Sequence, residues 1–580
     1  MDPGKVFFDP NTLSKDGTTS LAAWSVSEDG KYFAYGLTEA GSDWMEWHIR
    51  EVATGKDLPE ILKYIKFFAV SWTPDGKGFF YSRFPASDEK NKLQALSIDQ
   101  AIYYHRVGTP QASDELIYNR PDDKYLRVVG QVTEDGHWLV IYVIKGGSPN
   151  RMVYVKDLSH KEATIQPLID SMDAFYALIG NDGGTFYLKT DKHAPRGKVV
   201  AVDAATKNSR DIIPEAAESL YGVSLVNDQF LANYAKDAHT VVRVYNLKGK
   251  YLHDVALPGI GTAGGFGGRR HDTVVSYGFS NYTTPNTQYL YDLKTGKSTV
   301  FSRPKIDFDP SAYTVEQVFY TSHDGTRVPM FIAHKKGVQL DGSNPTILTA
   351  YGGFGDVSQR PFFEPMIQVW MDMGGVYAAP NIRGGGEYGE EWHRAGMREK
   401  KQNVFDDFIA AAEWLIANKY TRRDKLGIIG TSNGGLLIGA VLNQRPDLFG
   451  AAVAEVGVMD MLRFNKFTVG KSWVPEYGSP DEPADFKFIR VYSPLHNIQP
   501  GTKYPAVLVT TADHDDRVVP MHSFKYTAAL QAAQSGDKPI LIRVETNSGH
   551  GSSSTTKQID ETADKLSFLA KELDALARVR

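Results

Sequence analysis

Residues 430–434 have the sequence Gly-Thr-Ser-Asn-Gly, which places Ser432 in a G-x-S-x-G motif. The motif follows an apolar segment at 426–429 and precedes a segment at 435–442 of helical character. A serine on a tight turn between a strand and a helix exposes its hydroxyl, and glycines are needed because larger side chains would collide with both elements. This strand–turn–helix context predicts that Ser432 is a nucleophile for acyl transfer.

A serine nucleophile needs a histidine base and a carboxylate that orients the base. Three carboxylates, Asp513, Asp515 and Asp516, follow an expected strand at 506–511. They lie where the strand ends, and sheets of this kind assemble their sites at the carboxyl ends of strands. Composition and spacing leave open which of the three is the acid.

The expected base is His550, in the Gly-rich loop Asn547-Ser548-Gly549-His550-Gly551 after an expected strand at 540–544. The chain order serine, acid, histidine is that of α/β-hydrolases. Two other histidines compete for the role. His514 lies within the acid loop and His522 is expected to open a helix, so surface or capping roles are predicted for both.

The elements around these residues alternate between strands and helices, which predicts a parallel sheet covered on both faces. The α/β pattern starts near Pro304. Expected strands lie at 346–350, 375–379, 426–429, 506–511 and 540–544, and expected helices at 403–418, 435–442, 522–534 and 555–576.

The first half of the chain repeats a short sequence motif in which Asp-Gly precedes a run of aromatic or β-branched residues. Examples are Asp29-Gly30, Asp75-Gly76 and Asp135-Gly136. Asp-Gly between apolar runs predicts hairpins, and a period of roughly 45 to 55 residues with about four strands per unit is typical of β-propeller blades. We count about six repeats plus a stub, Val6-Phe7-Phe8, expected to be the last strand of an incomplete blade. An all-β sandwich or barrel is the alternative.

Composition excludes several classes of function. The net charge of −5 and the lack of a basic stripe argue against nucleic acid as a partner. The chain has no cysteine, which excludes disulfides and Cys-ligated metals, and it has no H-E-x-x-H metal motif. No apolar run is long enough for a membrane span and no signal peptide is visible, so we expect a cytoplasmic protein without membrane contact. A periplasmic or secreted protein is the alternative if a signal peptide lies upstream of this sequence. Gly259 to Gly264 match G-x-G-x-x-G, but more glycines follow instead of a helix, so we expect a mobile loop and no cofactor.

Five sequence blocks resemble the prolyl oligopeptidase family of serine peptidases. They are Tyr351-Gly352-Gly353-Phe354, 381–389 (Asn-Ile-Arg-Gly-Gly-Gly-Glu-Tyr-Gly), 430–435, 458–462 and 511–520. The resemblance covers nearly the whole chain. It implies a seven-bladed propeller joined to an α/β-hydrolase domain, with a cavity between them in which short peptides are cleaved after proline.

The resemblance also implies a role for individual residues. Ser432 is the expected nucleophile, Asp515 the acid of the triad and His550 the base. The oxyanion is expected to bind the backbone N–H of Asn433 and the hydroxyl of Tyr351.

The substrate contacts implied by the resemblance center on Trp473, whose indole is expected to stack on the substrate proline. Proline offers a rigid apolar face and has no N–H to satisfy, which suits a flat aromatic ring. Arg517 is expected to bind a substrate carbonyl just before the proline. The same apolar pocket is expected to be lined by Phe354, Val458, Tyr477 and Val518.

The predicted domains are a propeller over 1–305 and a hydrolase domain over 306–580. Members of the family carry a partly helical segment before the propeller, so this chain is expected to be truncated inside its first blade. Proline-containing peptides are the expected partners and a monomer is the expected state. Two alternatives stay open: a related oligopeptidase of different specificity, and a catalytically impaired chain that acts as a peptide-binding module.

Overall fold

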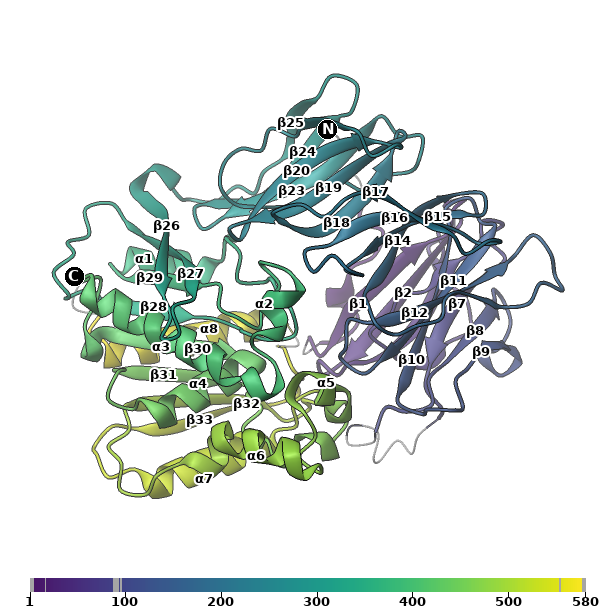
Figure 1. Cartoon of the computed structure of the whole chain (residues 1–580). Helices are drawn as coiled ribbons and strands as arrows, with labels where there is room; N and C mark the ends of the chain where they lie inside the picture. The colour runs from purple at the N-terminus through teal and green to yellow at the C-terminus, as the bar shows by residue number, and fades with distance from the viewer. Residues whose placement is uncertain (1–4, 16, 87–92, 94–95, 552–553, 576–580) are drawn as a thin grey trace.

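The computed structural model describes residues 5–15, 17–86, 93, 96–551 and 554–575. Antiparallel sheets make up the first half of the chain, and a mixed sheet with helices makes up the second half (Figure 1). The propeller and the hydrolase-like domain that the sequence predicts are therefore both present. The boundary at 305/306 stays a prediction.

Six sheets form the blades of the propeller. The first contains β1 (Thr19–Val26), β2 (Tyr32–Glu39), β3 (Trp44–Glu51), β4 (Lys56–Asp57) and β5 (Leu62–Lys66), and the second contains β6 (Ser71–Trp72), β7 (Gly78–Arg83), β8 (Ala101–Arg106) and β9 (Glu115–Tyr118). The third contains β10 (Leu126–Val132), β11 (Trp138–Lys145), β12 (Arg151–Asp157) and β13 (Gln166–Ile169), and the fourth contains β14 (Tyr176–Asp182), β15 (Thr185–Thr190), β16 (Lys198–Asp203) and β17 (Ser209–Ile213). The fifth contains β18 (Ser219–Val226), β19 (Gln229–Lys236), β20 (His239–Asn246) and β21 (Tyr251–Asp254), and the sixth contains β22 (Thr262–Gly265), β23 (Val274–Asn281), β24 (Thr284–Asp292) and β25 (Lys297–Ser302).

The Asp-Gly motifs form the turns between neighbouring strands, as predicted. In the third blade Thr133 donates its hydroxyl hydrogen bond to Asp135, and Gly136 follows with a φ of +72°. A side chain at Gly136 would also collide with Pro74 of the second blade. The turn therefore needs glycine for its conformation and for its packing.

Two local expectations about the propeller are wrong. The stub Val6-Phe7-Phe8 forms no strand, and the first strand begins at Thr19. The segment expected to be a mobile loop contributes Thr262–Gly265 to the sixth blade as strand β22, because these residues pair with β23.

Each blade packs on the next through a shared apolar core. Five buried clusters join the first blade to the second, the second to the third, and so on to the sixth. Six blades in the described part of the chain are one fewer than the seven-bladed type that the resemblance implies. The seven-bladed prediction is therefore not supported, whereas the count of about six repeats is.

The second half builds an eight-stranded sheet in the order β26-β27-β29-β28-β30-β31-β32-β33. The first two pairings are antiparallel and the remaining five are parallel. The strands are β26 (Tyr313–Thr321), β27 (Arg327–Lys335), β28 (Thr346–Thr349), β29 (Val376–Pro380), β30 (Leu426–Thr431), β31 (Ala451–Glu455), β32 (Ala506–Ala512) and β33 (Ile540–Glu545).

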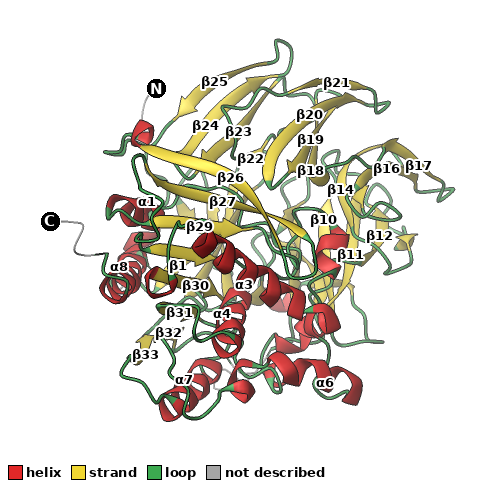
Figure 2. Cartoon of the chain, turned by 60° about the vertical axis from the view of Figure 1, so that its left-hand side comes forward, coloured by secondary structure: helices red, strands yellow, loops and turns green. Residues whose placement is uncertain are grey.

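Helices cover both faces of this sheet, as expected for parallel strands (Figure 2). One buried core contains residues of α3, α4 and α7, and a second core on the opposite face contains residues of α1 and α8. None of the described helices is long and apolar enough to cross a bilayer. The helices are α1 (Pro365–Asp372), α2 (Glu390–Arg394), α3 (Gln402–Ala417), α4 (Asn433–Gln444), α5 (Val474–Tyr477), α6 (Pro483–Tyr492), α7 (Met521–Ala533) and α8 (Thr555–Glu572).

Candidate active site

Ser432 lies on a sharp turn between β30 and α4. Its φ of +61° and ψ of −114° are strained for a residue with a side chain. The backbone N–H of Ser432 donates to the carbonyl of Glu455 on β31, at 2.8 Å. A side chain at Gly430 would meet the carbonyl of Gly434 at 2.4 Å, which explains why the motif begins with glycine. The turn presents the Ser432 hydroxyl at the carboxyl end of the sheet.

Of the three carboxylates after β32, Asp515 reaches His550. Its Oδ2 lies 2.9 Å from Nδ1 of His550, and its Oδ1 accepts the backbone N–H groups of Arg517 and Val518. Asp515 is completely buried. Two backbone donors hold the carboxylate in place, so it can orient the imidazole of His550.

The other two carboxylates have different partners. Asp513 binds the ring of its neighbour His514. Asp516 accepts from Nζ of Lys66 in the propeller at 2.8 Å, and both of these side chains are buried. The three adjacent acids thus serve three separate purposes, and composition alone could not have distinguished them.

The two rival histidines have partners other than the nucleophile. His514 is paired with Asp513 and partly exposed. His522 is the second residue of α7 and is buried, not on the surface as expected. Its Nδ1 accepts the backbone N–H of Asp460, and burial lowers the pKa of His522 to about 4. It is therefore a neutral structural histidine.

Ser432 and His550 line one cavity of about 380 Å³ together with Tyr351 and Arg517. In the described part of the chain these two catalytic candidates share the cavity without a hydrogen bond between them. Such bonds often form only when substrate is bound. Among the described residues no group of three or more His, Asp or Glu side chains is arranged to hold a metal ion.

Of the two expected oxyanion donors, Tyr351 lines this cavity and Asn433 directly follows Ser432. Burial raises the pKa of Tyr351 to about 12, although a hydrogen-bonding contact with Ser432 opposes the rise. The phenol therefore stays protonated at neutral pH and can donate. The N–H of Asn433 belongs to the first turn of α4, where backbone N–H groups have no partner within the helix.

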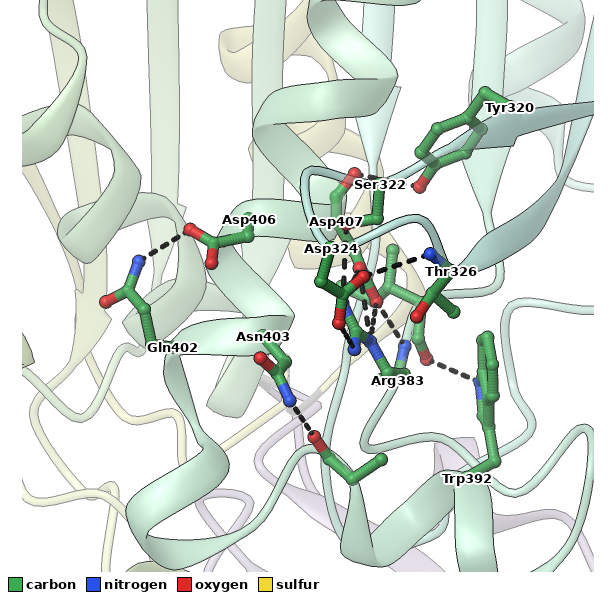
Figure 3. A network of polar contacts seen from close by, with 12 residues as sticks. Tyr320, Ser322, Asp324, Thr326, Arg383, Trp392, Gln402, Asn403, Asp406 and Asp407 are labelled. Atoms are coloured by element: carbon green, nitrogen blue, oxygen red, sulfur yellow. Dashed lines mark hydrogen bonds and ion pairs between the residues drawn. The ribbon is translucent and has the colours of Figure 1, made fainter.

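A network of polar contacts surrounds the buried residues Arg383 and Asp407 (Figure 3). Arg383 binds Asp407 of α3 through Nε and Nη2, and its Nη1 binds Asp324 in the turn between β26 and β27. The next residue, Gly384, packs directly on the backbone of Gly352. This network fixes the glycine loop on which the Tyr351 segment rests.

The five apolar residues implied for the substrate pocket gather in one hydrophobic cluster. Val458, Tyr477 and Val518 are buried in it, and Phe354 and Trp473 pack against it, half-buried. The rings of Phe354 and Tyr477 meet edge to face at 5.5 Å between centroids.

Sequence reasoning missed one member of this cluster, Phe464. Its buried ring stacks on the indole of Trp473, with 6.2 Å between centroids and 16° between planes. It also meets Tyr477 edge to face. Nothing in the spacing of Phe464 pointed to the pocket, because it lies in a short 3-10 helix, Phe464–Lys466, nine residues before Trp473.

Turns of the propeller contact the loops that carry the candidate catalytic residues. The residues after β2 bring Asp43 to Arg517, with contacts of 2.6 and 3.1 Å, and bring Gly41 against Gly549 beside His550. In the third blade the N–H of Gly147 donates to the carbonyl of Ser472, next to Trp473, at 2.5 Å. Arg517, expected to bind substrate, is thus also part of the domain interface.

Comparisons with known proteins agree with this architecture. Residues 1–304 match a family described as the prolyl oligopeptidase N-terminal beta-propeller domain, and residues 361–575 match the prolyl oligopeptidase family. The chain is 45% identical over 576 residues to the prolyl endopeptidase of Elizabethkingia miricola, covering 98% of this chain and 81% of the relative. It is 41% identical over 600 residues to prolyl oligopeptidase A of Galerina marginata, with coverages of 98% and 81%.

Solved structures show the same likeness. A structure from a study of two prolyl endopeptidases superposes with a TM-score of 0.95 at 41% identity, covering 99% of this chain and 85% of that chain. Prolyl oligopeptidase B from Galerina marginata, bound to a 35mer hydrolysis and macrocyclization substrate, superposes with a TM-score of 0.93 at 35% identity, with coverages of 98% and 82%.

Proposed function

The chain belongs to the prolyl oligopeptidase family, and on that premise we propose that it is a serine endopeptidase that cleaves short peptides after proline. The observation that carries the proposal is that His550, paired with the buried Asp515, shares a cavity with Ser432 on its strained turn. The family resemblance inferred from the sequence is confirmed. The catalytic roles of the individual residues are part of the proposal.

The reaction proceeds through an acyl-enzyme. Nε2 of His550 takes the hydroxyl proton as Oγ of Ser432 attacks the carbonyl carbon of proline, and then gives it to the leaving amine as the peptide bond breaks. Water next attacks the ester, with His550 again as the base, and the peptide acid leaves while Ser432 regains its proton. Asp515 holds Nδ1–H of the ring and stabilises the imidazolium.

The negative charge on the tetrahedral oxygen is met by two donors. These are the backbone N–H of Asn433 and the phenol of Tyr351. Their positions are fixed before the reaction, so no reorganisation is needed when the charge develops. One such donor is typically worth about 3 kcal/mol in the transition state.

Specificity for proline follows from the apolar cluster. Trp473 presents a flat ring, while Phe354, Val458, Tyr477 and Val518 supply the remaining walls. None of these five positions carries a carboxylate, which cleavage after Lys or Arg would require. Arg517 binds the substrate carbonyl before the proline, and its Asp43 partner holds the guanidinium in place.

Two matched substrates test the proposal. An N-blocked Gly-Pro peptide and its Gly-Ala analogue should carry the same fluorogenic amine as the leaving group. We expect the proline substrate to be hydrolysed with the higher kcat/KM. A preference for alanine or for a basic residue would favour the oligopeptidase of different specificity. No turnover of any substrate would favour the peptide-binding module.

The oligomeric state and the cellular compartment are also proposals. We propose a monomer, which light scattering of the purified chain tests directly. The cytoplasmic location stays a prediction, to be tested by fractionating cells that express the protein at its native level.

A further inference from the structure

A buried lysine connects the two segments that carry the oxyanion donors. Nζ of Lys401 donates to the carbonyl of Gly352 at 2.8 Å and to Oδ1 of Asn433 at 3.2 Å. Gly352 follows Tyr351 directly, and Asn433 follows Ser432. We propose that Lys401 is a positioning residue that sets the geometry of the oxyanion hole; the proposal rests on the serine peptidase function above.

The amide of Asn433 extends the link to Tyr351 itself. Its Nδ2 donates to the carbonyl of Tyr351 at 2.6 Å, while its Oδ1 also accepts the hydroxyl of Tyr477 at 2.8 Å. The ammonium of Lys401 can only donate and the carbonyl of Tyr351 can only accept, so the amide oxygen must face Lys401 and the amide nitrogen must face Tyr351. The orientation of Asn433 is therefore determined, and with it the distance between the two donor segments.

A second charged group holds the far end of the Tyr351 loop. Oε1 of Glu476 accepts the N–H of Phe354 at 3.0 Å and lies 3.9 Å from Nζ of Lys401. Oε2 of the same carboxylate lies 2.8 Å from Nε2 of His393. Two charged side chains thus bind the loop from Tyr351 to Phe354. Lys401 binds the carbonyl of Gly352, and Glu476 binds the N–H of Phe354.

Lys401 occupies a position that is unfavourable for a lysine. It is only 1% exposed, and it immediately precedes α3, whose N-terminal end repels positive charge. An ammonium group out of water costs free energy unless it is paired and hydrogen-bonded. Burial lowers the pKa of Lys401 to about 8, although Glu476 opposes the shift. The ammonium group is kept here by its acceptors, the carbonyl of Gly352 and the amide oxygen of Asn433, and these are the contacts that join the two segments with the oxyanion donors.

The test replaces Lys401 by methionine, which has similar length and no charge. If the oxyanion donors lose their geometry, kcat for the Gly-Pro substrate should fall about tenfold to a hundredfold while KM changes little, because a misplacement near 1 Å costs about this much. A peptide aldehyde ending in prolinal, which forms a tetrahedral adduct with Ser432, should lose affinity by the same factor.

Lys425→Met is the matched control. Lys425 is also buried in the hydrolase domain and also binds a carbonyl, that of Leu573, and a carboxylate, that of Asp574. It makes these contacts at the amino end of β30, and Ser432 follows the opposite end of that strand. We expect this variant to lower the melting temperature without changing kcat or the aldehyde affinity.

A double variant shows through which group Lys401 acts. Tyr351→Phe removes the hydroxyl donor, so the loss caused by Lys401→Met should be smaller in that background than in the parent protein, because neighbouring contributions are not additive. Full additivity would contradict a role through Tyr351. If Lys401→Met is insoluble, Lys401→Gln, which keeps a donor but no charge, carries the same comparison.

The outcomes separate this inference from the proposed function. If the parent protein hydrolyses the Gly-Pro substrate and Lys401→Met keeps the parental kcat while its melting temperature falls, Lys401 is structural and the inference is overturned. If the parent protein has no activity and no reactive serine, the proposed function fails first.

Discussion

Asp43 of the propeller and Arg517 of the hydrolase domain form a two-point ion pair, with Oδ1 2.6 Å from Nη2 and Oδ2 3.1 Å from Nε. The backbone N–H of Asp43 also donates to Asp516 at 3.0 Å. Arg517 lies two residues after Asp515, the proposed triad acid. A turn of the propeller is therefore bonded to the loop that carries the proposed triad acid, the partner of His550.

Asp43→Asn should weaken catalysis. The guanidinium of Arg517 loses its charged partner, so it should bind the substrate carbonyl in a less defined position. Because Arg517 is partly exposed, solvent screens the pair and the loss should be modest, about threefold to thirtyfold in kcat/KM and mostly through KM. Steady-state kinetics with the Gly-Pro substrate measures this.

Asp57→Asn is the control for Asp43→Asn. Arg50 and Asp57 form a similar two-point pair in the same blade, away from the catalytic loops. We expect unchanged kinetics for this variant. Equal losses in the two variants would show that damage to the blade, and not the contact with Arg517, explains the effect.

Asp515→Asn should cost far more activity than Asp513→Asn. An asparagine at 515 cannot stabilise the imidazolium and favours the wrong tautomer, and such a change in a triad lowers kcat by about 10⁴. Asp513 contacts His514 at the edge of the loop, so its loss should be within a few fold. The opposite ranking in kcat would mean that another carboxylate serves as the acid.

Trp473→Ala should reduce the preference for proline over alanine. Burial and stacking of the pyrrolidine on the indole should contribute roughly 1 to 3 kcal/mol. The ratio of kcat/KM for the Gly-Pro and Gly-Ala substrates should therefore fall about tenfold to a hundredfold. An unchanged ratio would place the proline pocket elsewhere.

The buried His393 should make stability depend on pH. Burial alone would lower its pKa, but hydrogen bonds to Glu390 and Glu476 outweigh this and raise the pKa of His393 to about 9. The folded protein then holds a proton that the unfolded chain releases near pH 6.5, so the stabilisation is complete below about pH 6.5 and is lost as the pH rises through about 9.

His393→Gln isolates this contribution. The free energy of unfolding of the parent protein and of the variant should be measured in urea at pH 6 and at pH 9.5. The stability advantage of the parent protein over the variant should be smaller at pH 9.5 than at pH 6, by an amount on the order of 3 kcal/mol. Parallel pH profiles for the two proteins would contradict a protonated His393.

The sequence predicted the parts of the fold that have local signals. Asp-Gly turns located the blades, and the helix and strand predicted on either side of Ser432 are α4 and β30. Strand β31 was not predicted, because Ala451–Glu455 is short and rich in alanine. Strands β26 and β27 were not predicted either, because they pair antiparallel before the alternating pattern of strands and helices begins.

The sequence predicted only those residues of the site that belong to local motifs. Ser432 and His550 each follow from a local motif and their order along the chain. Lys401 and Glu476 act through contacts between distant segments, whereas Phe464 contacts nearby residues but belongs to no motif. A lysine followed by a helix is ordinarily a solvated residue. The burial of Lys401 can be recognised only from the folded structure, where the loops of the hydrolase domain surround it.

Covalent labelling tests the central claim most directly. A diphenyl phosphonate built on proline and its alanine counterpart should each be incubated with the intact protein, and the labelled residue identified by peptide mass spectrometry. We expect the proline reagent to add one equivalent to Ser432, faster than the alanine reagent, and we expect no label on Ser432→Ala, whose hydrolysis should fall by a factor on the order of 10⁶. Label on another residue, or no label on a folded parent protein, would contradict the account.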